Sequence, residues 1–125
     1  DILLGPRADA FTPERLALLT GQDWEVSQHS SRVGLRLNGA QPLLRDDATE
    51  LPSEGTVRGA IQVPHSGQPV LFMADHPLTG GYPVIGVVAA HHLDLAAQIP
   101  PGARIRFRPL APFAEIGAFE LERSL

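Results

Sequence analysis

Proline and glycine divide this chain into short segments. Each occurs 12 times in 125 residues, whereas average usage is about 5% for proline and about 7% for glycine. Proline interrupts helices and the interior of sheets, and glycine supplies the backbone conformations that tight turns need. The sequence therefore favours many turns and short strands over a helical bundle.

The clearest strand pattern is a pair of apolar runs at residues 60–63 and 70–73. The residues between them, 64–69, read Pro-His-Ser-Gly-Gln-Pro. In such a connection proline fixes φ, and glycine allows the positive φ of a tight reversal. We therefore predict a β-hairpin over residues 60–73.

The rest of the chain adds further short elements. Strands are expected where polar and apolar residues alternate or β-branched residues cluster, at residues 2–4, 23–27, 32–37, 82–90 and 103–110. Helices are expected at residues 93–99, 112–122 and, after an N-cap at Thr12, 13–20. Residues 40–54 are expected to form a surface loop. The pattern predicts one domain over residues 1–125, mainly β, as a β-barrel or sandwich with two or three short peripheral helices.

Composition narrows the classes of partner. The formal net charge is −4 and basic residues do not cluster, so a nucleic-acid partner is not expected. No window approaches the roughly 20 apolar residues of a membrane span, so no membrane partner is expected either. The absence of cysteine excludes thiolate chemistry and disulfides and is consistent with a cytoplasmic protein.

No metal site is predicted, although the sequence contains metal-capable groups at His76, His91, His92, Asp75 and Asp94. The adjacent pair His91 and His92 lacks the i, i+4 spacing of ligands on one helix face. On a strand, the two side chains would point to opposite faces. We therefore expect no metal ligands among these residues.

Polar side chains next to the predicted hairpin strands are candidate ligand-binding groups. Asp75 follows the second strand, where it is either an anchor or proton acceptor for a ligand or the cap of the next turn. Gln62 carries an amide inside an apolar strand, and Gln68 lies in the turn. Both amides can donate to and accept from an amide or carboxylate. For Gln62 the alternative is a structural hydrogen bond within the barrel.

Two further segments carry ligand-binding chemistry. Residues 79–83 read Thr-Gly-Gly-Tyr-Pro, so Gly80 and Gly81 either present backbone N–H groups to an anion or form a tight turn. Tyr82 adds a ring with a polar tip. Arg32, which follows two serines, either binds a carboxylate or forms a surface ion pair. The glycine spacing does not match a nucleotide-binding motif, and no serine lies in a Gly-x-Ser-x-Gly pattern.

Several motifs occur in an order that resembles one protein family. They are Ser-Arg-Val-Gly-Leu-Arg-Leu-x-Gly at 31–39, Ser-Glu-Gly at 53–55, Gly-x-Ile-Gln-Val-Pro-x-x-Gly-Gln-Pro at 59–69, Ala-Asp at 74–75 and Thr-Gly-Gly-Tyr-Pro at 79–83. From Leu4 to Phe107 the chain is similar to the C-terminal half of the allophanate hydrolase subunit 2 family. This biotin-dependent carboxyltransferase-like family includes the 5-oxoprolinase C-type subunit and the antagonist of a sporulation-kinase inhibitor. The resemblance implies a cyclophilin-like closed β-barrel and an N-terminal half beyond these residues.

The resemblance also implies the C-terminal domain of a subunit in an ATP-dependent 5-oxoprolinase-type amidohydrolase. The complex would use ATP, and this domain alone would bind no cofactor and be inactive. The implied partners are its own N-terminal half, a subunit 1-like cyclophilin-fold protein that corresponds to the 5-oxoprolinase B-type subunit, and the A-type subunit of the same enzyme. Asp75 and Gln62 are the expected catalytic residues in a cleft for a small lactam or amide. The expected substrate-binding residues are Gln68, Thr79, Gly80, Gly81, Tyr82, Arg32 and Glu54.

The resemblance leaves two alternatives open. The family commonly has Arg-Gln-Thr where this chain has His-Pro-Leu at residues 76–78, and this departure bears on the substrate. One alternative is a biotin-dependent carboxyltransferase of the urea carboxylase or allophanate type, with biotin on another domain because this chain has no Met-Lys pair. The other is a non-catalytic interaction module that antagonises a kinase inhibitor, with an interface formed by exposed Trp24, Phe113 or Phe119.

Overall fold

Nine strands and two α-helices make up the described part of the chain, which in this computed structural model comprises residues 1–4, 11–45 and 54–109. The strands are β1 (Ile2–Leu4), β2 (Trp24–Val26), β3 (Gly34–Asn38), β4 (Glu54–Gly55), β5 (Ala60–Gln62), β6 (Val70–Phe72), β7 (Thr79–Gly80), β8 (Val84–Val88) and β9 (Arg104–Ile105). The helices are α1 (Pro13–Gly21), the 3-10 helix η2 (Ala90–His92) and α2 (Leu93–Ala96). No helix among the described residues has the length and apolar character needed to span a membrane.

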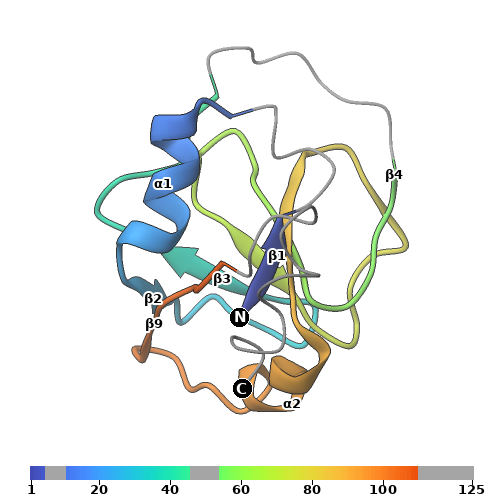
Figure 1. Ribbon diagram of the computed structural model, residues 1–125. Coiled ribbons are helices and arrows are strands. Elements are labelled where there is room, and N and C mark those ends of the chain that lie inside the picture. Colours follow the sequence, from blue (N-terminus) through green and yellow to red (C-terminus); the bar gives the residue numbers. More distant parts are fainter. Residues whose placement is uncertain (5–10, 46–53, 110–125) are drawn as a thin grey trace, which may run out of the picture.

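Seven strands form one curled antiparallel sheet (Figure 1), in the order β1-β8-β5-β6-β3-β2-β9. The predicted hairpin lies at its centre, where β5 and β6 pair antiparallel with Ile61 opposite Leu71. Gly67, at a φ of 76°, allows the turn between them. Leu43 packs onto this turn, because its N–H donates to the carbonyl of Gly67 at 2.7 Å. The remaining strands, β4 and β7, form a separate two-stranded ribbon.

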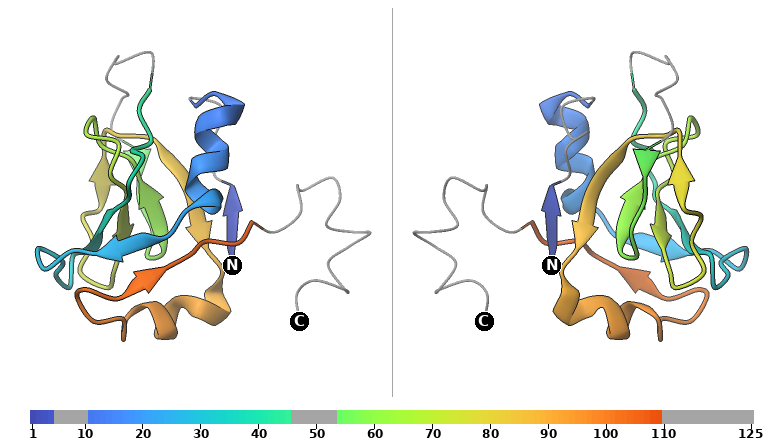
Figure 2. Two further views of the ribbon diagram at one scale, coloured as in Figure 1. Left: turned by 90° about the vertical axis from the view of Figure 1, so that its left-hand side faces the viewer. Right: turned by 90° about the vertical axis from the view of Figure 1, so that its right-hand side faces the viewer.

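The segment after β9 returns to β1 (Figure 2). Ile2 forms a parallel bridge with Pro109, and its N–H donates to the carbonyl of Arg108 at 2.9 Å. On its other side β1 pairs with β8, with Ile2 opposite Val88. This bridge brings the two ends of the curled sheet together. The prediction of a mainly β chain with short peripheral helices is therefore confirmed.

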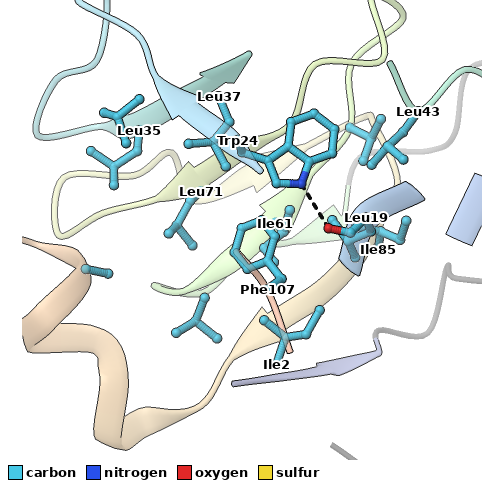
Figure 3. Close-up of a cluster of buried hydrophobic side chains, with 14 of the residues drawn as sticks. Ile2, Leu19, Trp24, Leu35, Leu37, Leu43, Ile61, Leu71, Ile85 and Phe107 are labelled. Carbon is cyan, nitrogen blue, oxygen red and sulfur yellow. Dashed lines mark hydrogen bonds between the residues drawn. The ribbon is translucent and has the colours of Figure 1, made fainter. Parts of the chain in front are cut away.

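The apolar side chains inside the curl form one core (Figure 3). Trp24 is fully buried there, and its indole N–H donates to the carbonyl of Leu19 at 2.9 Å, which ties β2 to α1. The expectation that Trp24 could be exposed at an interface is wrong. In β2 the buried and exposed positions alternate, so Trp24 and Val26 face the core while Glu25 faces solvent.

Most predicted elements are present with shifted bounds. The hydroxyl of Thr12 accepts from the N–H of Arg15 at 3.3 Å and caps α1, as predicted. The helix expected over residues 93–99 ends at Ala96, and the tighter bond from Gln98 N to Leu95 O, at 3.1 Å, marks where it stops. The strand expected over residues 103–110 is reduced to β9. The helix expected at 112–122, with Phe113 and Phe119, and most of the loop at 40–54 lie outside the described residues.

Candidate functional site

Gln62 lies on β5 with its side chain directed at the β4–β7 ribbon. The residue is 9% exposed. A Cβ atom added to Gly80 would lie 2.4 Å from the Gln62 Nε2 atom, so a side chain at position 80 would force this amide to move. Within the described residues, the Gln62 side chain forms no hydrogen bond. The structural bond considered for Gln62 from the sequence is therefore not found in this part of the chain.

The β4–β7 ribbon holds the backbone beside this amide. Glu54 pairs with Gly80 and Gly55 with Thr79, and the N–H of Thr56 donates to the carbonyl of Leu78 at 3.0 Å. Only the backbone of Glu54 is described, so the place of its carboxylate is outside the described structure. The ribbon thus carries the Thr79-Gly80 segment past Gln62.

The loop after β7 lies beside the end of β5. The N–H of Val63 donates to the carbonyl of Pro83 at 3.0 Å, so this loop is bonded to the end of β5. The ring of Tyr82 packs edge to face against that of His65, with the ring centres 5.0 Å apart. Tyr82 is 37% exposed, and its ring therefore remains accessible at this surface.

His76, where the family commonly has arginine, connects β6 to the ribbon. Its Nδ1 atom lies 3.2 Å from the hydroxyl of Thr56, which also donates to the carbonyl of Pro77. The His76 ring stacks on Phe72, with ring centres 5.9 Å apart and planes at 17°. Thr56, which the sequence analysis did not select, thus links this histidine to the ribbon next to Gly80. Its position directly after the Ser-Glu-Gly motif was the available signal.

Asp75 pairs with Arg32 at the end of β6. The Arg32 Nε atom lies 3.2 Å from Asp75 Oδ2, and the Asp75 N–H donates to the Arg32 carbonyl at 3.0 Å. The next turn is closed by the backbone, because His76 N donates to Met73 O at 3.1 Å. The two side chains are 86% and 55% exposed, so solvent screens the pair and it contributes little to stability. The surface ion pair considered for Arg32 is therefore observed.

Gln68 is engaged by the backbone of another segment. Its Oε1 atom accepts from Gly39 N at 2.9 Å, and its Nε2 atom donates to Gly39 O at 3.3 Å. Both functional atoms of the amide therefore hold the β3 end against the hairpin turn. The predicted set separates into Gln62 with Gly80, Arg32 with Asp75, and Gln68 with Gly39.

We expect Gln68→Ala to lower the free energy of unfolding by about 1–2 kcal/mol, because it removes two hydrogen bonds to Gly39. Urea denaturation followed by circular dichroism measures this change. Gln98→Ala is the matched control, since Gln98 is exposed on the surface. Equal stability of the two variants would contradict a structural role for the Gln68 amide.

His91 and His92 lie in the 3-10 helix η2, and their rings are 4.2 Å apart. The expectation that they point to opposite faces of a strand is wrong, because β8 ends at Val88. The His91 Nε2 atom lies 3.2 Å from Asp1 Oδ2, and Arg108 binds Asp1 Oδ1 at 3.0 Å. Partial burial, and after it the neighbouring positive charges, lower the pKa of His92 below its usual value.

The groups of Asp1, His91 and His92 that could ligate a metal lie within 4.8 Å of one another. The Asp1 carboxylate already has a guanidinium partner in Arg108. A metal ion would therefore have to share this carboxylate with a positive charge, which is unfavourable.

The chain matches known proteins over most of its length. The family described as carboxyltransferase domain, subdomain A and B, matches residues 1–109. The C-type subunit of the Escherichia coli 5-oxoprolinase is 40% identical over 105 residues, which cover 84% of this chain and 34% of that protein. The urea amidolyase of Lachancea kluyveri is 32% identical over 120 residues, which cover 88% of this chain and 6% of that protein.

The fold is also similar to part of a solved structure. The crystal structure of the Kluyveromyces lactis urea amidolyase superimposes with a TM-score of 0.75 and 28% identity, covering 88% of this chain and 7% of that one. The chain spans about a third of the length of the E. coli protein that it matches. Similar residues therefore form one region within each of these longer proteins.

Proposed function

This chain belongs to the carboxyltransferase domain family, subdomains A and B, and on this basis we propose that it is the C-terminal domain of a 5-oxoprolinase-type subunit. The complex would be an ATP-dependent amidohydrolase of the cytoplasm, and this domain would line a cleft for a small lactam or amide. Its partners would be its own N-terminal half and the A-type and B-type subunits of a 5-oxoprolinase. The identity to the C-type 5-oxoprolinase subunits of E. coli and Haemophilus influenzae supports this assignment.

The observation that carries the proposal is the Gln62 amide. It is nine-tenths buried, lies against Gly80, and has no hydrogen-bond partner among the described side chains and backbone groups. The residue is largely buried, but its amide atoms are not enclosed, so their hydrogen-bonding capacity is open to a ligand. A lactam presents one N–H donor and one carbonyl acceptor on adjacent atoms, which match the carbonyl and NH2 group of glutamine. Gln62 would bind and orient the lactam through this pair.

The other predicted residues would complete the cleft, with Asp75 acting from the separate group that it forms with Arg32. The Thr79-Gly80-Gly81 backbone would let the substrate approach closely, and Tyr82 would supply a wall with a polar tip. Asp75 would accept or orient a proton, held in place by its ion pair with Arg32. Glu54, whose backbone pairs with Gly80, is the remaining proposed substrate-binding residue.

The test uses the full-length parent protein with its candidate partner subunits. Release of glutamate from 5-oxoproline should require ATP and should disappear when this protein is omitted. Gln62→Leu should then raise KM about tenfold, because it removes the donor and the acceptor that would bind the substrate. The size of the side chain changes little. Circular dichroism should show an unfolding transition no lower than that of the wild type, since the substitution breaks no side-chain hydrogen bond within the described structure.

Gln98→Leu is the control, because Gln98 is exposed and lies after α2. An unchanged KM and kcat for Gln62→Leu would contradict the proposed site. In the same assay, an Asp75→Asn enzyme with full turnover would exclude the proton-transfer role of Asp75.

A carboxyltransferase is the second candidate, favoured by the urea amidolyase relatives. All ten basic side chains in these 125 residues are arginines, so biotin could not be attached to this stretch and would have to arrive on another domain. Urea also offers adjacent donor and acceptor groups to Gln62. The assembled parent should then carboxylate urea only when a biotin carrier is present. It should not act on 5-oxoproline.

A further inference from the structure

A cavity of about 450 Å3 lies beside the Arg32–Asp75 pair. Its apolar lining consists of Leu35, Met73, Ala74, Ala97, Ile99 and Pro101. Its polar lining consists of Ser30, Ser31, Arg32 and Arg58. The cavity therefore joins the turn before β3, the end of β6, the segment after α2 and the connection between β4 and β5. This volume is in the range of small-molecule sites, about 300–1,000 Å3.

Arg58 is the side chain that gives the cavity its charge. Its Nε atom is buried and has no hydrogen-bond partner within the described structure. Its Nη2 atom reaches only the Leu93 carbonyl at 3.5 Å and a carboxylate oxygen of Asp94 at 3.8 Å. The Asp94 side chain is 96% exposed, so solvent weakens this contact. The Arg58 side chain lines the cavity and is 37% exposed, so its terminal nitrogens, and not the enclosed Nε atom, are the donors open to an anion there.

Arg32 and the two serines lie on the same lining. Arg32 uses its Nε atom for Asp75, which leaves its terminal nitrogens for another anion. The Ser31 hydroxyl accepts from Val33 N at 3.2 Å and retains a hydrogen to donate. Asp75 and Asp94 are not part of the lining, so among the described residues the charged groups facing this cavity are both guanidinium groups. Asp75 balances part of the charge of Arg32, so the preference of the cavity for a negative charge depends mainly on Arg58.

We propose that this cavity binds a small monocarboxylate with an apolar tail. The carboxylate would accept hydrogen bonds from the terminal nitrogens of Arg58 and Arg32, and the tail would pack on Leu35, Met73 and Ile99. A carboxylate is planar and offers two oxygens, which suits a guanidinium better than a single-point acceptor would. This site differs from that of Gln62, where the glutamine amide would bind the amide group of a lactam. The inference stands without the proposed function, because it is tested without partner subunits and without ATP.

Met73 makes the site directly observable. It is the one methionine of the sequence, it is 5% exposed, and it lines the cavity. In the full chain isotopically labelled on its methionine methyl group, titration with hexanoate should shift the Met73 methyl NMR signal in a saturable manner. Hexanamide, which has the same tail without the charge, should bind at least about tenfold more weakly.

Two variants and a control decide whether the guanidinium groups are responsible. Arg58→Gln should weaken hexanoate binding about tenfold, and Arg32→Gln should weaken it by a smaller factor. Arg32 is 86% exposed, so its variant remains informative even if Arg58→Gln fails to fold. Arg104→Gln changes an exposed arginine on β9 outside the cavity and should leave binding unchanged.

Three results would overturn the proposal. One is equal binding of hexanoate and hexanamide, which would leave an apolar cavity without selectivity for charge. Another is unchanged hexanoate affinity in both Arg32→Gln and Arg58→Gln. If Arg58→Gln does not fold, unchanged affinity in Arg32→Gln alone is sufficient. Absence of any Met73 shift at saturating hexanoate would overturn it as well.

Discussion

Trp24→Ala is expected to lower the free energy of unfolding by about 3–5 kcal/mol, the range for removing a large aromatic side chain from a core. Trp24 is fully buried, and its indole N–H donates to Leu19 at 2.9 Å. The substitution therefore leaves a cavity between β2 and α1 and an unpaired carbonyl on the helix. A Cβ on Gly39 would lie 2.5 Å from the Trp24 ring, so the backbone of this neighbouring residue is packed directly on the indole.

Urea denaturation followed by far-UV circular dichroism measures this effect, since the only tryptophan is the one removed. Trp24→Phe retains a ring but not the N–H donor and should lose less stability than Trp24→Ala. Leu95→Ala is the control for a large apolar residue on the surface, because Leu95 is 61% exposed. A loss below about 1 kcal/mol for Trp24→Ala would contradict its place at the centre of the core.

Gly67→Ala is expected to lower the free energy of unfolding by about 3 kcal/mol. Its φ of 76° is strained by about 1–2 kcal/mol for an alanine. A Cβ there would also lie 2.8 Å from Leu43 N and 2.8 Å from Pro42 Cβ, so the substitution must push the backbone of another segment away. Such overpacking costs a further 1–3 kcal/mol, approximately.

Gly102→Ala is the matched control, because Gly102 has a similar φ of 87° and open space where the Cβ would lie. It should cost only the backbone strain, about 1–2 kcal/mol. The difference between the two variants in urea denaturation isolates the packing of residues 42–43 on the hairpin turn. Equal losses would show that this contact does not stabilise the fold.

Local signals predicted the elements that depend on neighbouring residues. The hairpin follows from two apolar runs around a Pro-rich turn with Gly67, and α1 follows from the N-cap at Thr12. Both depend on contacts between residues close in sequence, where turn and cap preferences act directly. The exposed Trp24 of the interaction-module alternative was wrong, because the alternation in β2 places Trp24 and Val26 together on the core face.

Contacts between segments distant in sequence could not be predicted from local sequence patterns. Gln68 meets Gly39 across 29 positions, and no local pattern indicates that a turn glutamine will bind a backbone glycine elsewhere. Gln62 was selected because an amide in an apolar strand requires an explanation, but its position against Gly80 depends on the β4–β7 ribbon. Arg58 was missed because it lies between two motifs, and only the fold places it in one cavity with Arg32.

The pairing of β1 has a consequence for the order of events in folding. β1 bonds to β8 on one side and to residues 108–109 on the other, so both partners are synthesised long after it and the second comes at the end of the described chain. Such non-local pairing gives a high contact order, and domains of this kind fold in milliseconds to seconds. On the ribosome, Ile2 and its neighbours must therefore wait as an unpaired apolar strand while the central hairpin can already form. Chaperone dependence and aggregation during synthesis are thus expected to concentrate on this first strand.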